Sequence, residues 1–382
     1  MSTAFDIQRA TRRIRLGMVG GGDGSFIGAA HRVAARLDDQ FELVAGALSS
    51  TPERAHASAA KLHIAAERSY ADYAAMAAAE SRREDGIDAV VIVTPNHLHV
   101  PVAQAFVQQG IHVICDKPMA TSLAEAQELA HAVRERGLLF LLTHTYAGYP
   151  MVRQAREWVA AGELGQLRIV QVEYAQDWLG EPVERQGNKQ AEWRADPKRA
   201  GPAGALGDIG THAYQLARFV SGLTVQELSA ELSTFVPGRV LDDHVQAMLR
   251  FEGGARGMLW VSQVASGACN ALRLRLYGTR ASLHFDQEQP EQLWFAPLGE
   301  PARLLRRGMP PQSAVQASAS RIPAGHSEGY FEAFAELYRD FARAWRGGRS
   351  PAMPGLQDGL DGMAFIEAVL SSHQQNAGWV RL

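Results

Sequence analysis

Short apolar runs alternate with alanine-rich stretches through the first 148 residues, and this alternation restricts the possible folds more than any other feature. The apolar runs have the length of strands and lie at 14–19, 41–48, 89–93, 111–114 and 138–142. The stretches between them contain helix-forming residues. Strands and helices in alternation form a parallel sheet with helices on both faces. The sequence therefore predicts an N-terminal α/β domain, residues 1–148, with a doubly wound parallel sheet.

The pattern changes beyond residue 149. After a predicted helix at 151–161, longer strands of alternating polarity follow at 167–176, 225–235, 244–252, 255–262, 272–277 and 281–285. Turn residues join several of these neighbours, which is typical of antiparallel pairing. We therefore expect a C-terminal α+β domain, residues 149–382, built on a large open antiparallel sheet. Within it, 297–323 is predicted to be a polar loop, and an amphipathic helix follows at 331–345.

The predicted open sheet also indicates that copies of this chain associate with one another. Strands of alternating polarity leave one face without a helical cover, and such a face commonly becomes a subunit interface. We therefore expect a homo-oligomer that associates through the C-terminal sheet. The sequence leaves dimer and tetramer as open alternatives.

Length and composition exclude other classes of protein. A chain of 382 residues exceeds the usual size of one hydrophobic core, which agrees with two domains. The formal net charge is −3 without a long basic or acidic run, so neither nucleic acid nor a membrane is an expected partner. Cys115 and Cys269 have no metal or disulfide-framework spacing, so no metal site is expected. The first fifteen residues lack the apolar core of a secretory signal, and we expect a cytoplasmic protein.

A glycine-rich loop follows the first predicted strand. Residues 20–28 contain Gly20, Gly22, Gly24 and Gly28, and an alanine-rich helix begins directly after them. Glycines let the backbone approach a pyrophosphate, and a helix N-terminus supplies N–H donors. Five residues separate Gly22 from Gly28 where the common dinucleotide-binding spacing has two, and Ser25 could donate its hydroxyl to a phosphate. Glycine-rich turns also occur as plain connectors, but the position after the first strand favours a phosphate loop.

The end of the second predicted strand bears on the choice of cofactor. NAD enzymes usually place an acidic residue there for the ribose 2′-hydroxyl, but this chain has Ser49 and Ser50, with Arg54 one helical turn further on. A guanidinium without a competing carboxylate is compatible with the 2′-phosphate of NADP. Alternatively, Ser49 binds an unphosphorylated ribose. Both alternatives stay open, and Arg54 slightly favours NADP.

Polar residues also follow the next two strands. The run at 111–114 ends in Cys115-Asp116-Lys117-Pro118, and the run at 89–93 ends in Thr94-Pro95-Asn96-His97-Leu98-His99. Ligands bind at the carboxyl ends of parallel strands, and a cis bond at the proline would fix the direction of Lys117. A partly desolvated lysine there can polarise or deprotonate a substrate hydroxyl, whereas Asn96 or His99 could contact a nicotinamide. The alternative for Lys117 is a solvated salt bridge at a strand end.

The C-terminal half contains a second polar motif, Gly207-Asp208-Ile209-Gly210-Thr211-His212. If a helix begins at Asp208, then Asp208 and His212 lie on one helical face and can act together. Histidine titrates near neutral pH, so it can take a proton from a hydroxyl whose carbon loses a hydride. An isolated motif of this kind is more often a helix-capping aspartate with a buried histidine.

Several further side chains are candidate pocket walls, and each is at least as consistent with ordinary packing. A tryptophan in this group could stack on a sugar face, and His326 is a weaker candidate that could simply cap a helix. The candidate walls are Tyr146, Tyr149, Trp178, Trp193 and Arg194.

Taken together, the motifs resemble the Gfo/Idh/MocA oxidoreductase family, named after glucose–fructose oxidoreductase, inositol dehydrogenase and rhizopine catabolism proteins. The resemblance spans nearly the whole chain, in order and spacing: the loop at 20–28 with Ile27 and His31, then 94–99, 116–118 and 207–212. Three departures stand out. The glycine loop is longer, Asp116 replaces the more usual glutamate, and Ser49 stands where many NAD members carry aspartate.

The resemblance implies a Rossmann domain followed by an α+β domain, and a nicotinamide-dependent dehydrogenase acting on a sugar, a sugar derivative or an inositol-like cyclic polyol. His212 would be the general acid/base, Lys117 would hydrogen-bond the reacting hydroxyl, and Asp208 would hold the substrate. The implied substrate contacts are Lys117, Tyr146, Tyr149, Trp178, Asp208 and His212. The implied NAD(P)(H) contacts are Gly20, Gly22, Gly24, Ser25, Phe26, Ile27, Ser49, Ser50, Arg54, Thr94, Pro95, Asn96, His99, Asp116, Lys117, Trp193 and Arg194.

Two other functions are alternatives to the dehydrogenase. The family resemblance also includes glycosidases that use tightly held NAD in a transient oxidation–elimination cycle. A protein that only senses NAD(P) is the other alternative. The presence of Lys117, Asp208 and His212 argues against a sensor, because a sensor needs no proton-transfer group.

Overall fold

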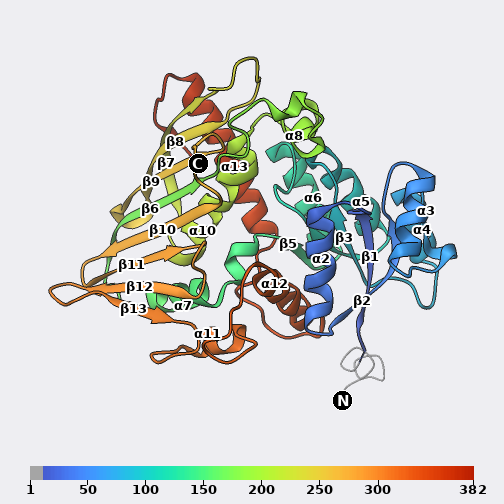
Figure 1. Cartoon of the computed structure of the whole chain (residues 1–382), viewed down its shortest axis with the longest axis horizontal. Coiled ribbons are helices and arrows are strands. Elements are labelled where there is room, and N and C mark those ends of the chain that lie inside the picture. The colour runs from blue at the N-terminus through green and yellow to red at the C-terminus, as the bar shows by residue number, and fades with distance from the viewer. Residues whose placement is uncertain (1–11) are drawn as a thin grey trace. The chain divides into compact units, whose positions relative to one another are not determined.

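The computed structural model describes residues 12–382, so most of the segment considered for a secretory signal lies outside the described residues (Figure 1). The chain forms two compact units. The N-terminal unit comprises residues up to 120, 124–145 and 334–360, and the C-terminal unit comprises 121–123, 146–333 and 361–382. Within residues 12–382, no helix is long and apolar enough to cross a membrane.

The N-terminal unit contains the predicted doubly wound parallel sheet. Five parallel strands lie in the order β2-β1-β3-β4-β5. The order reverses beside β1, which has β2 on one side and β3 on the other, and such a switch point is where α/β sheets bind ligands. The strands are β1 Ile14–Gly20, β2 Phe41–Ala47, β3 Ala89–Val93, β4 His112–Cys115 and β5 Phe140–Leu142. The accompanying helices are α2 Phe26–Leu37, α3 Pro52–Lys61, α4 Tyr73–Glu80, α5 His99–Gln108 and α6 Leu123–Glu135.

Burial explains why these strands are apolar throughout. All five residues of β3 are buried, as expected for a parallel strand between two helical layers. Helix α12, Tyr330–Trp345, comes from the distant C-terminal part of the chain, and its residues from Phe334 onward belong to this unit. The ring of Phe334 lies 4.6 Å from that of His31, and the ring of Tyr338 lies 5.0 Å from that of Phe41. The predicted amphipathic helix at 331–345 thus completes the core beside α2 and β2.

The C-terminal unit is built on the predicted large sheet (Figure 1). Its strand order is β13-β12-β11-β10-β6-β9-β8-β7-β14, and neighbours are antiparallel except for the parallel pair β6–β9. Helices α7 Pro150–Ala160 and α10 Thr211–Ser221 pack on one face of the sheet. The strands are β6 Leu167–Ala175, β7 Val225–Ser233, β8 His244–Phe251, β9 Arg256–Ser262, β10 Ala271–Gly278, β11 Ala281–Asp286, β12 Gln292–Pro297, β13 Arg303–Arg306 and β14 Val380–Arg381.

The prediction of a loop over 297–323 was wrong. This segment contains β13 and the short helix α11, Ala314–Ala319, and the long helix α13, Leu356–Gln374, was not predicted either. Strand β13 has four residues and α11 has six, which is too short to show a hydrophobic period. Helix α13 contains Gly359 and Gly362, which weaken a helical signal.

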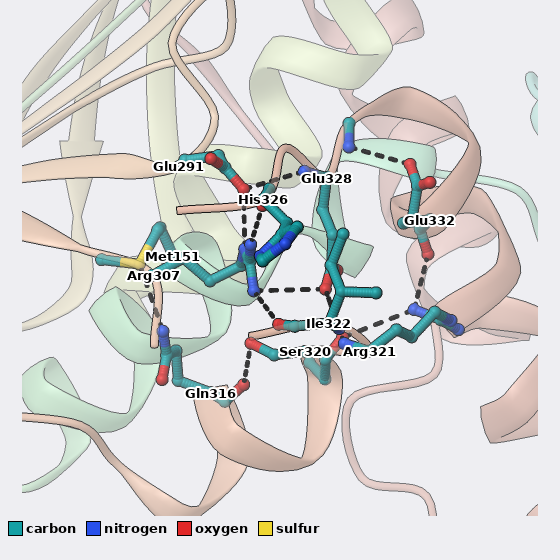
Figure 2. Close-up of polar contacts among 12 residues, drawn as sticks. Met151, Glu291, Arg307, Gln316, Ser320, Arg321, Ile322, His326, Glu328 and Glu332 are labelled. Atoms are coloured by element: carbon teal, nitrogen blue, oxygen red, sulfur yellow. Dashed lines mark hydrogen bonds and ion pairs between the residues drawn. The ribbon is translucent and has the colours of Figure 1, made fainter. Parts of the chain in front are cut away.

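A buried arginine organises the segment after β13 (Figure 2). The Arg307 side chain is 2% exposed, donates to Glu291 Oε1 at 2.7 Å and pairs with Glu328 Oε1 at 3.2 Å. It also donates to the carbonyl oxygens of Ile322, at 2.7 Å, and His326. The backbone of His326 is therefore part of this network, while the residue itself is exposed. Through these hydrogen bonds and ion pairs, Arg307 connects residues 322–328 to the end of β13.

Removing this guanidinium should destabilise the protein strongly. We expect Arg307→Met to lower the free energy of unfolding by about 3–5 kcal/mol, because it leaves the buried carboxylate of Glu328 and the partly exposed one of Glu291 without their cationic partner. The matched control is Arg303→Met, whose ion pair with Glu300 has side chains 58% and 54% exposed, and which should cost less than about 1 kcal/mol. Urea unfolding measures both values, and equal losses in the two variants would contradict a stabilising role for the Arg307 network.

Candidate active-site residues

The glycine loop between β1 and α2 is closely packed against its surroundings. Gly20 has φ +76°, and a Cβ added there would lie 2.3 Å from the carbonyl oxygen of Val93. A Cβ on Gly28 would lie 2.3 Å from the Gly21 carbonyl oxygen. Ser25 caps α2, where its Oγ accepts from the Gly28 N–H at 3.1 Å. Only glycines fit this approach of backbone to backbone, which leaves the first turn of α2 suited to an anion such as pyrophosphate.

Charges in and beside this loop are paired. Arg32 on α2 donates to the Gly21 carbonyl oxygen and so fixes that peptide. Asp23 forms an exposed ion pair with Lys61, whose hydrogen bond lowers the pKa of the Asp23 carboxyl. The loop carboxylate is therefore ionised at neutral pH, with a cation beside it. Of the other predicted loop contacts, Gly24 and Phe26 are exposed and Ile27 is half-buried.

The carboxyl end of β2 presents small polar side chains. Ser49 is half-buried, and its Oγ accepts from the Thr51 N–H at 3.2 Å. Ser50 and Arg54 are exposed, and Arg54 lies in the first turn of α3. Residues 48–52, which follow the strand, contain no carboxylate.

The carboxyl end of β3 is joined to the lysine motif. Asn96 is buried and begins a short 3₁₀ turn, and His99 begins α5. His99 is 1% exposed; its Nδ1 lies 2.7 Å from the Pro118 carbonyl oxygen, and its Nε2 lies 3.0 Å from that of Thr94. Burial lowers the pKa of His99. Thr94, Pro95 and Asn96 thus lie beside the loop that carries Lys117.

Lys117 is the second residue after β4 and is half-buried, and the Lys117–Pro118 peptide bond is cis. Asp116 Oδ1 accepts from Thr143 Oγ1 at 2.7 Å and from His31 Nε2 at 3.0 Å. Burial alone would raise the pKa of Asp116, but the interactions with His31 and Thr143 outweigh it and lower the pKa. Asp116 is therefore a carboxylate at neutral pH.

His144 is a further residue of this site that the sequence analysis did not select. It follows β5 and is buried, and burial together with the charge of Lys117 lowers its pKa to about 3. His144 is therefore neutral at physiological pH. The available signal was its position, because Thr143 and His144 directly follow a buried strand as Asp116 and Lys117 do.

In the C-terminal unit, Asp208 lies just before α10, and His212 is the second residue of that helix. The expectation of an α-helix from Asp208 onward needs correction, because Leu206–Gly210 forms a π-helical turn and α10 begins at Thr211. Asp208 Oδ2 accepts from Gln263 Nε2 at 2.9 Å and from Arg194 Nε at 3.2 Å. The carboxylate is thus held by side chains from outside its own helix.

His212 is 9% exposed and packs against two tyrosines. Its ring centroid lies 4.9 Å from that of Tyr146 and 6.4 Å from that of Tyr174. The hydroxyls of Tyr146 and Tyr174 are hydrogen-bonded to each other, and Tyr174 donates to Asn270 Oδ1 at 2.7 Å. Burial raises the pKa of both phenols, which are therefore neutral. His212 is therefore an imidazole that lies against two neutral phenols.

The predicted aromatic walls divide into two groups. The Arg194 guanidinium lies 4.2 Å from the Trp193 ring centroid and 5.8 Å from that of Trp178, so these three residues accompany Asp208. Tyr149 is 2% exposed and stacks beside Tyr146 at 6.3 Å. Its position in the interior makes it a support for Tyr146.

Neutral hydrogen-bonding side chains complete the cluster, and the sequence analysis missed them. Gln176 Nε2 donates to Asn270 Oδ1 at 2.7 Å, and Gln176 Oε1 accepts from Trp178 Nε1 at 3.0 Å. Gln176 follows β6, Gln263 follows β9 and Asn270 precedes β10. Because β10, β6 and β9 are neighbours in the sheet, these three amides meet at the same end of the three strands. Single polar residues at strand ends carry no pattern that a sequence reading could detect.

Asp242 holds the chain directly before Asp208. Its Oδ1 accepts from the Gly204 N–H at 2.6 Å, and its Oδ2 accepts from the Leu206 N–H at 2.8 Å. Burial raises the pKa of Asp242 to about 6, although the two backbone donors oppose this shift. The position of Asp208 therefore depends on a carboxyl group buried behind it.

Both units match models of one protein family. Residues 14–144 match an oxidoreductase family with an NAD-binding Rossmann fold. With the parallel sheet and its glycine loop, this match defines an oxidoreductase with an NAD-binding domain. Residues 152–284 match the C-terminal domain of the Gfo/Idh/MocA proteins. The chain belongs to the Gfo/Idh/MocA family, which confirms the resemblance predicted from its motifs.

Individual relatives match almost from end to end. An uncharacterized oxidoreductase of Bacillus subtilis, YfiI, is 33% identical over 381 residues, covering 97% of each chain. Levoglucosan dehydrogenase of Pseudarthrobacter phenanthrenivorans is 29% identical, covering 97% of this chain and 98% of its own. The crystal structure of an inositol dehydrogenase homologue of Azotobacter vinelandii, complexed with NADH and myo-inositol, has 35% identity and a TM-score of 0.92. That match covers 98% of this chain and 99% of the homologue.

The raised pKa of Asp242 predicts a particular pH dependence of stability. The folded protein keeps the Asp242 proton up to about pH 6, whereas an unfolded chain releases it near pH 4. The stability that the folded state gains from this bound proton is present below about pH 4 and is lost as the pH rises through about 6. We therefore expect Asp242→Asn to gain stability relative to wild type by about 1–3 kcal/mol between these pH values.

Urea unfolding at several pH values and constant ionic strength tests this expectation. Asp72→Asn is the control for loss of a helix-capping carboxylate, because Asp72 is exposed and accepts from the Ala75 N–H at 2.7 Å. A relative loss of stability with rising pH would show that the Gly204 and Leu206 donors outweigh burial.

Proposed function

We propose that this protein is an NAD(P)-dependent dehydrogenase that oxidises a hydroxyl-bearing carbon of an uncharged sugar, sugar derivative or cyclic polyol. The observation that carries the proposal is the cluster around Asp208 and His212. It places a titratable imidazole and a carboxylate among phenols and amides. The inositol dehydrogenase homologue and levoglucosan dehydrogenase are similar in fold and sequence, and their substrates belong to this chemical class.

The cluster favours a neutral, hydroxyl-rich substrate. Hydroxyl groups both donate and accept, and so do the amides of Gln176 and Gln263 and the phenols beside His212. The Arg194 guanidinium pairs with Asp208 and does not stand alone as a partner for a substrate carboxylate. A polyol therefore matches these side chains better than a sugar acid does.

Each reacting residue has a distinct role in the proposal. His212 takes the proton from the substrate hydroxyl as the carbon–oxygen single bond becomes a carbonyl, and it returns the proton in the reverse direction. Lys117 hydrogen-bonds the same oxygen and stabilises its developing negative charge. Asp208 holds a second hydroxyl of the substrate. The nicotinamide, when bound, accepts the hydride.

Residues 1–148 would hold the cofactor, and residues 149–382 would bind substrate and mediate oligomerisation. The pyrophosphate would lie at the first turn of α2, where backbone N–H groups can bind an anion, and Gly20 and Gly28 allow the loop backbone to pack closely beside that turn. Thr94 to Asn96 and the Asp116–Lys117 pair would lie toward the nicotinamide, and Ser49, Ser50 and Arg54 toward the adenosine ribose. We also propose a cytoplasmic location, since Cys115 and Cys269 are both free thiols.

Replacing either proton-handling residue should abolish most of the turnover. We expect Lys117→Met and His212→Asn to lower kcat by about two to four orders of magnitude with the fold intact. The measurement follows reduced nicotinamide in the near ultraviolet with myo-inositol, levoglucosan and a panel of hexoses. The control variants are Lys189→Met and His131→Asn, which change exposed residues of the same types.

Three outcomes separate the alternatives. Turnover that survives in both Lys117→Met and His212→Asn contradicts the assigned roles. Release of an aglycone from glycosides without net reduction of the cofactor indicates the oxidation–elimination glycosidase. Cofactor binding without either reaction indicates a sensor.

Cofactor choice is a separate proposal, in which Arg54 favours NADP over NAD. Arg54→Ala should lower kcat/KM for NADP about tenfold and leave NAD nearly unchanged, because one charge-assisted contact to the 2′-phosphate is lost. Ser49→Asp should shift the preference from NADP toward NAD, because the new carboxylate accepts from a ribose hydroxyl and repels a 2′-phosphate. Arg82→Ala, an exposed arginine of the same unit, is the control. A wild-type preference for NAD that Arg54→Ala does not change would contradict the proposal.

The outer face of the C-terminal sheet would form the subunit interface. Met248 and Met258 lie opposite each other on β8 and β9 and are 55% and 52% exposed. Ile169 and Tyr277, also exposed, are paired on β6 and β10. We expect wild type to be an oligomer in light scattering, and Met248→Glu/Met258→Glu to be monomeric. Leu298→Glu, at the 82%-exposed Leu298 outside the strands, should stay oligomeric; a monomeric wild type would contradict the proposal.

A further inference from the structure

Lys117 lies between two residues that buried histidines hold in place. Asp116 precedes it and is bonded by His31, and Pro118 follows it and is bonded by His99. The two histidines are 0% and 1% exposed. They come from different helices, α2 and α5, so the lysine loop is held from two directions.

On the Asp116 side, the hydrogen bonds define one chain of donors. An ionised carboxylate only accepts, so His31 must donate through Nε2–H at 3.0 Å. In the neutral tautomer, His31 Nδ1 then accepts from the Tyr338 hydroxyl at 2.7 Å. Thr143 Oγ1 donates to the same Asp116 oxygen at 2.7 Å. Three buried groups from α2, α12 and the end of β5 thus fix one carboxylate.

The backbone around Asp116 is held as well. The Asp116 N–H donates to the Ile92 carbonyl oxygen at 3.1 Å, and the Thr143 N–H donates to that of Cys115 at 2.9 Å. These bonds continue the sheet pattern of β3, β4 and β5 by one residue. Asp116 therefore cannot shift without breaking contacts to both neighbouring strands.

On the Pro118 side, both ring nitrogens of His99 face carbonyl oxygens. A carbonyl oxygen only accepts, so a neutral imidazole can bond only one of Pro118 and Thr94 at a time. Because the contact from Nδ1 to Pro118 is the shorter, at 2.7 Å, we assign the proton of the neutral ring to Nδ1. The second nitrogen faces Thr94 at 3.0 Å. Both nitrogens of His99 are thus directed at the backbone of its own unit.

We propose that His31 and His99 are positioning residues that act on catalysis through Lys117, by fixing the backbone on both sides of it. Neither would touch substrate or cofactor. This assigns His99 a role other than the cofactor contact expected from its position after β3. The inference rests on the proposed function, in which Lys117 must point at one oxygen. A lysine has four rotatable side-chain bonds, so a fixed backbone removes much of the orientation cost of its contact.

The first experiment compares pairs of variants that differ in one donor. His31→Leu and His99→Leu remove the donors. His31→Gln keeps an amide N–H near the position of Nε2, and His99→Asn keeps one near that of Nδ1. With myo-inositol or levoglucosan as substrate, we expect the leucine variants to lose about 10–100-fold in kcat. The amide variants should recover most of it, and the dissociation constant for NADH, from fluorescence titration, should change less than about threefold in all four.

A second readout does not depend on turnover. Acetylation of individual lysines, followed by peptide mass spectrometry, reports how freely each ammonium reacts. In the leucine variants, the labelling rate of Lys117 should rise about threefold or more, while those of Lys189 and Lys198 stay constant. This readout separates two failures: absence of any dehydrogenase activity in wild type would overturn the proposed function, whereas an unchanged Lys117 rate would overturn the positioning role.

Other outcomes are equally decisive. Weakened NADH binding with unchanged kcat in His99→Leu would make His99 a cofactor contact and overturn the proposal. If a leucine variant fails to fold, Thr143→Val removes one donor to Asp116 with little change in shape. It should lower kcat about 3–10-fold and raise Lys117 labelling, and wild-type values for both would refute the proposal.

Discussion

Keeping the largely buried carboxyl group of Asp116 ionised is the constraint on which the N-terminal site depends. Removal from water disfavours an ionised carboxyl group, and the electrostatic interaction and hydrogen bond with His31, together with the hydrogen bond from Thr143, offset that cost and keep the charge. Those donors come from α2 and from the end of β5, and Tyr338 of α12 supports His31 in turn. One buried charge thereby links segments more than 300 residues apart in sequence around the residue that precedes Lys117.

A related arrangement supports the C-terminal site. Asp242 holds the chain before Asp208 through two backbone N–H groups, and Gln263 and Arg194 hold Asp208 itself. In both units, buried polar groups that do not react themselves hold the potentially reactive residues in position. This division fits an enzyme, because side chains can act on a substrate only when others fix their geometry. It weighs against a protein that only senses its cofactor.

The position of each cluster follows from sheet geometry. In the parallel sheet, the polar residues after β1, β3 and β4 share one edge because all carboxyl ends point the same way. In the mostly antiparallel sheet, β6 and β9 run parallel side by side, so Gln176 and Gln263 also follow their strands at a common edge. The phenols of Tyr146 and Tyr174 lie beside His212, and the amides bond to Tyr174, Trp178 and Asp208, so groups that both donate and accept are present in this cluster. The neutral polyol that we propose as substrate would use both abilities.

The sequence by itself determined the α/β and α+β classes, the order of most strands and helices, and the motifs that contain Lys117, Asp208 and His212. Those features are local, since apolar periodicity and glycine spacing act within a few residues. Only the tertiary structure determined which residues without a local sequence signature belong to the site. Tyr174, Gln176, Gln263 and Asn270 matter only because neighbouring strands bring them together. Short elements such as β13 form because Arg307 and the adjacent strand stabilise them, and a four-residue segment carries no period that could predict it.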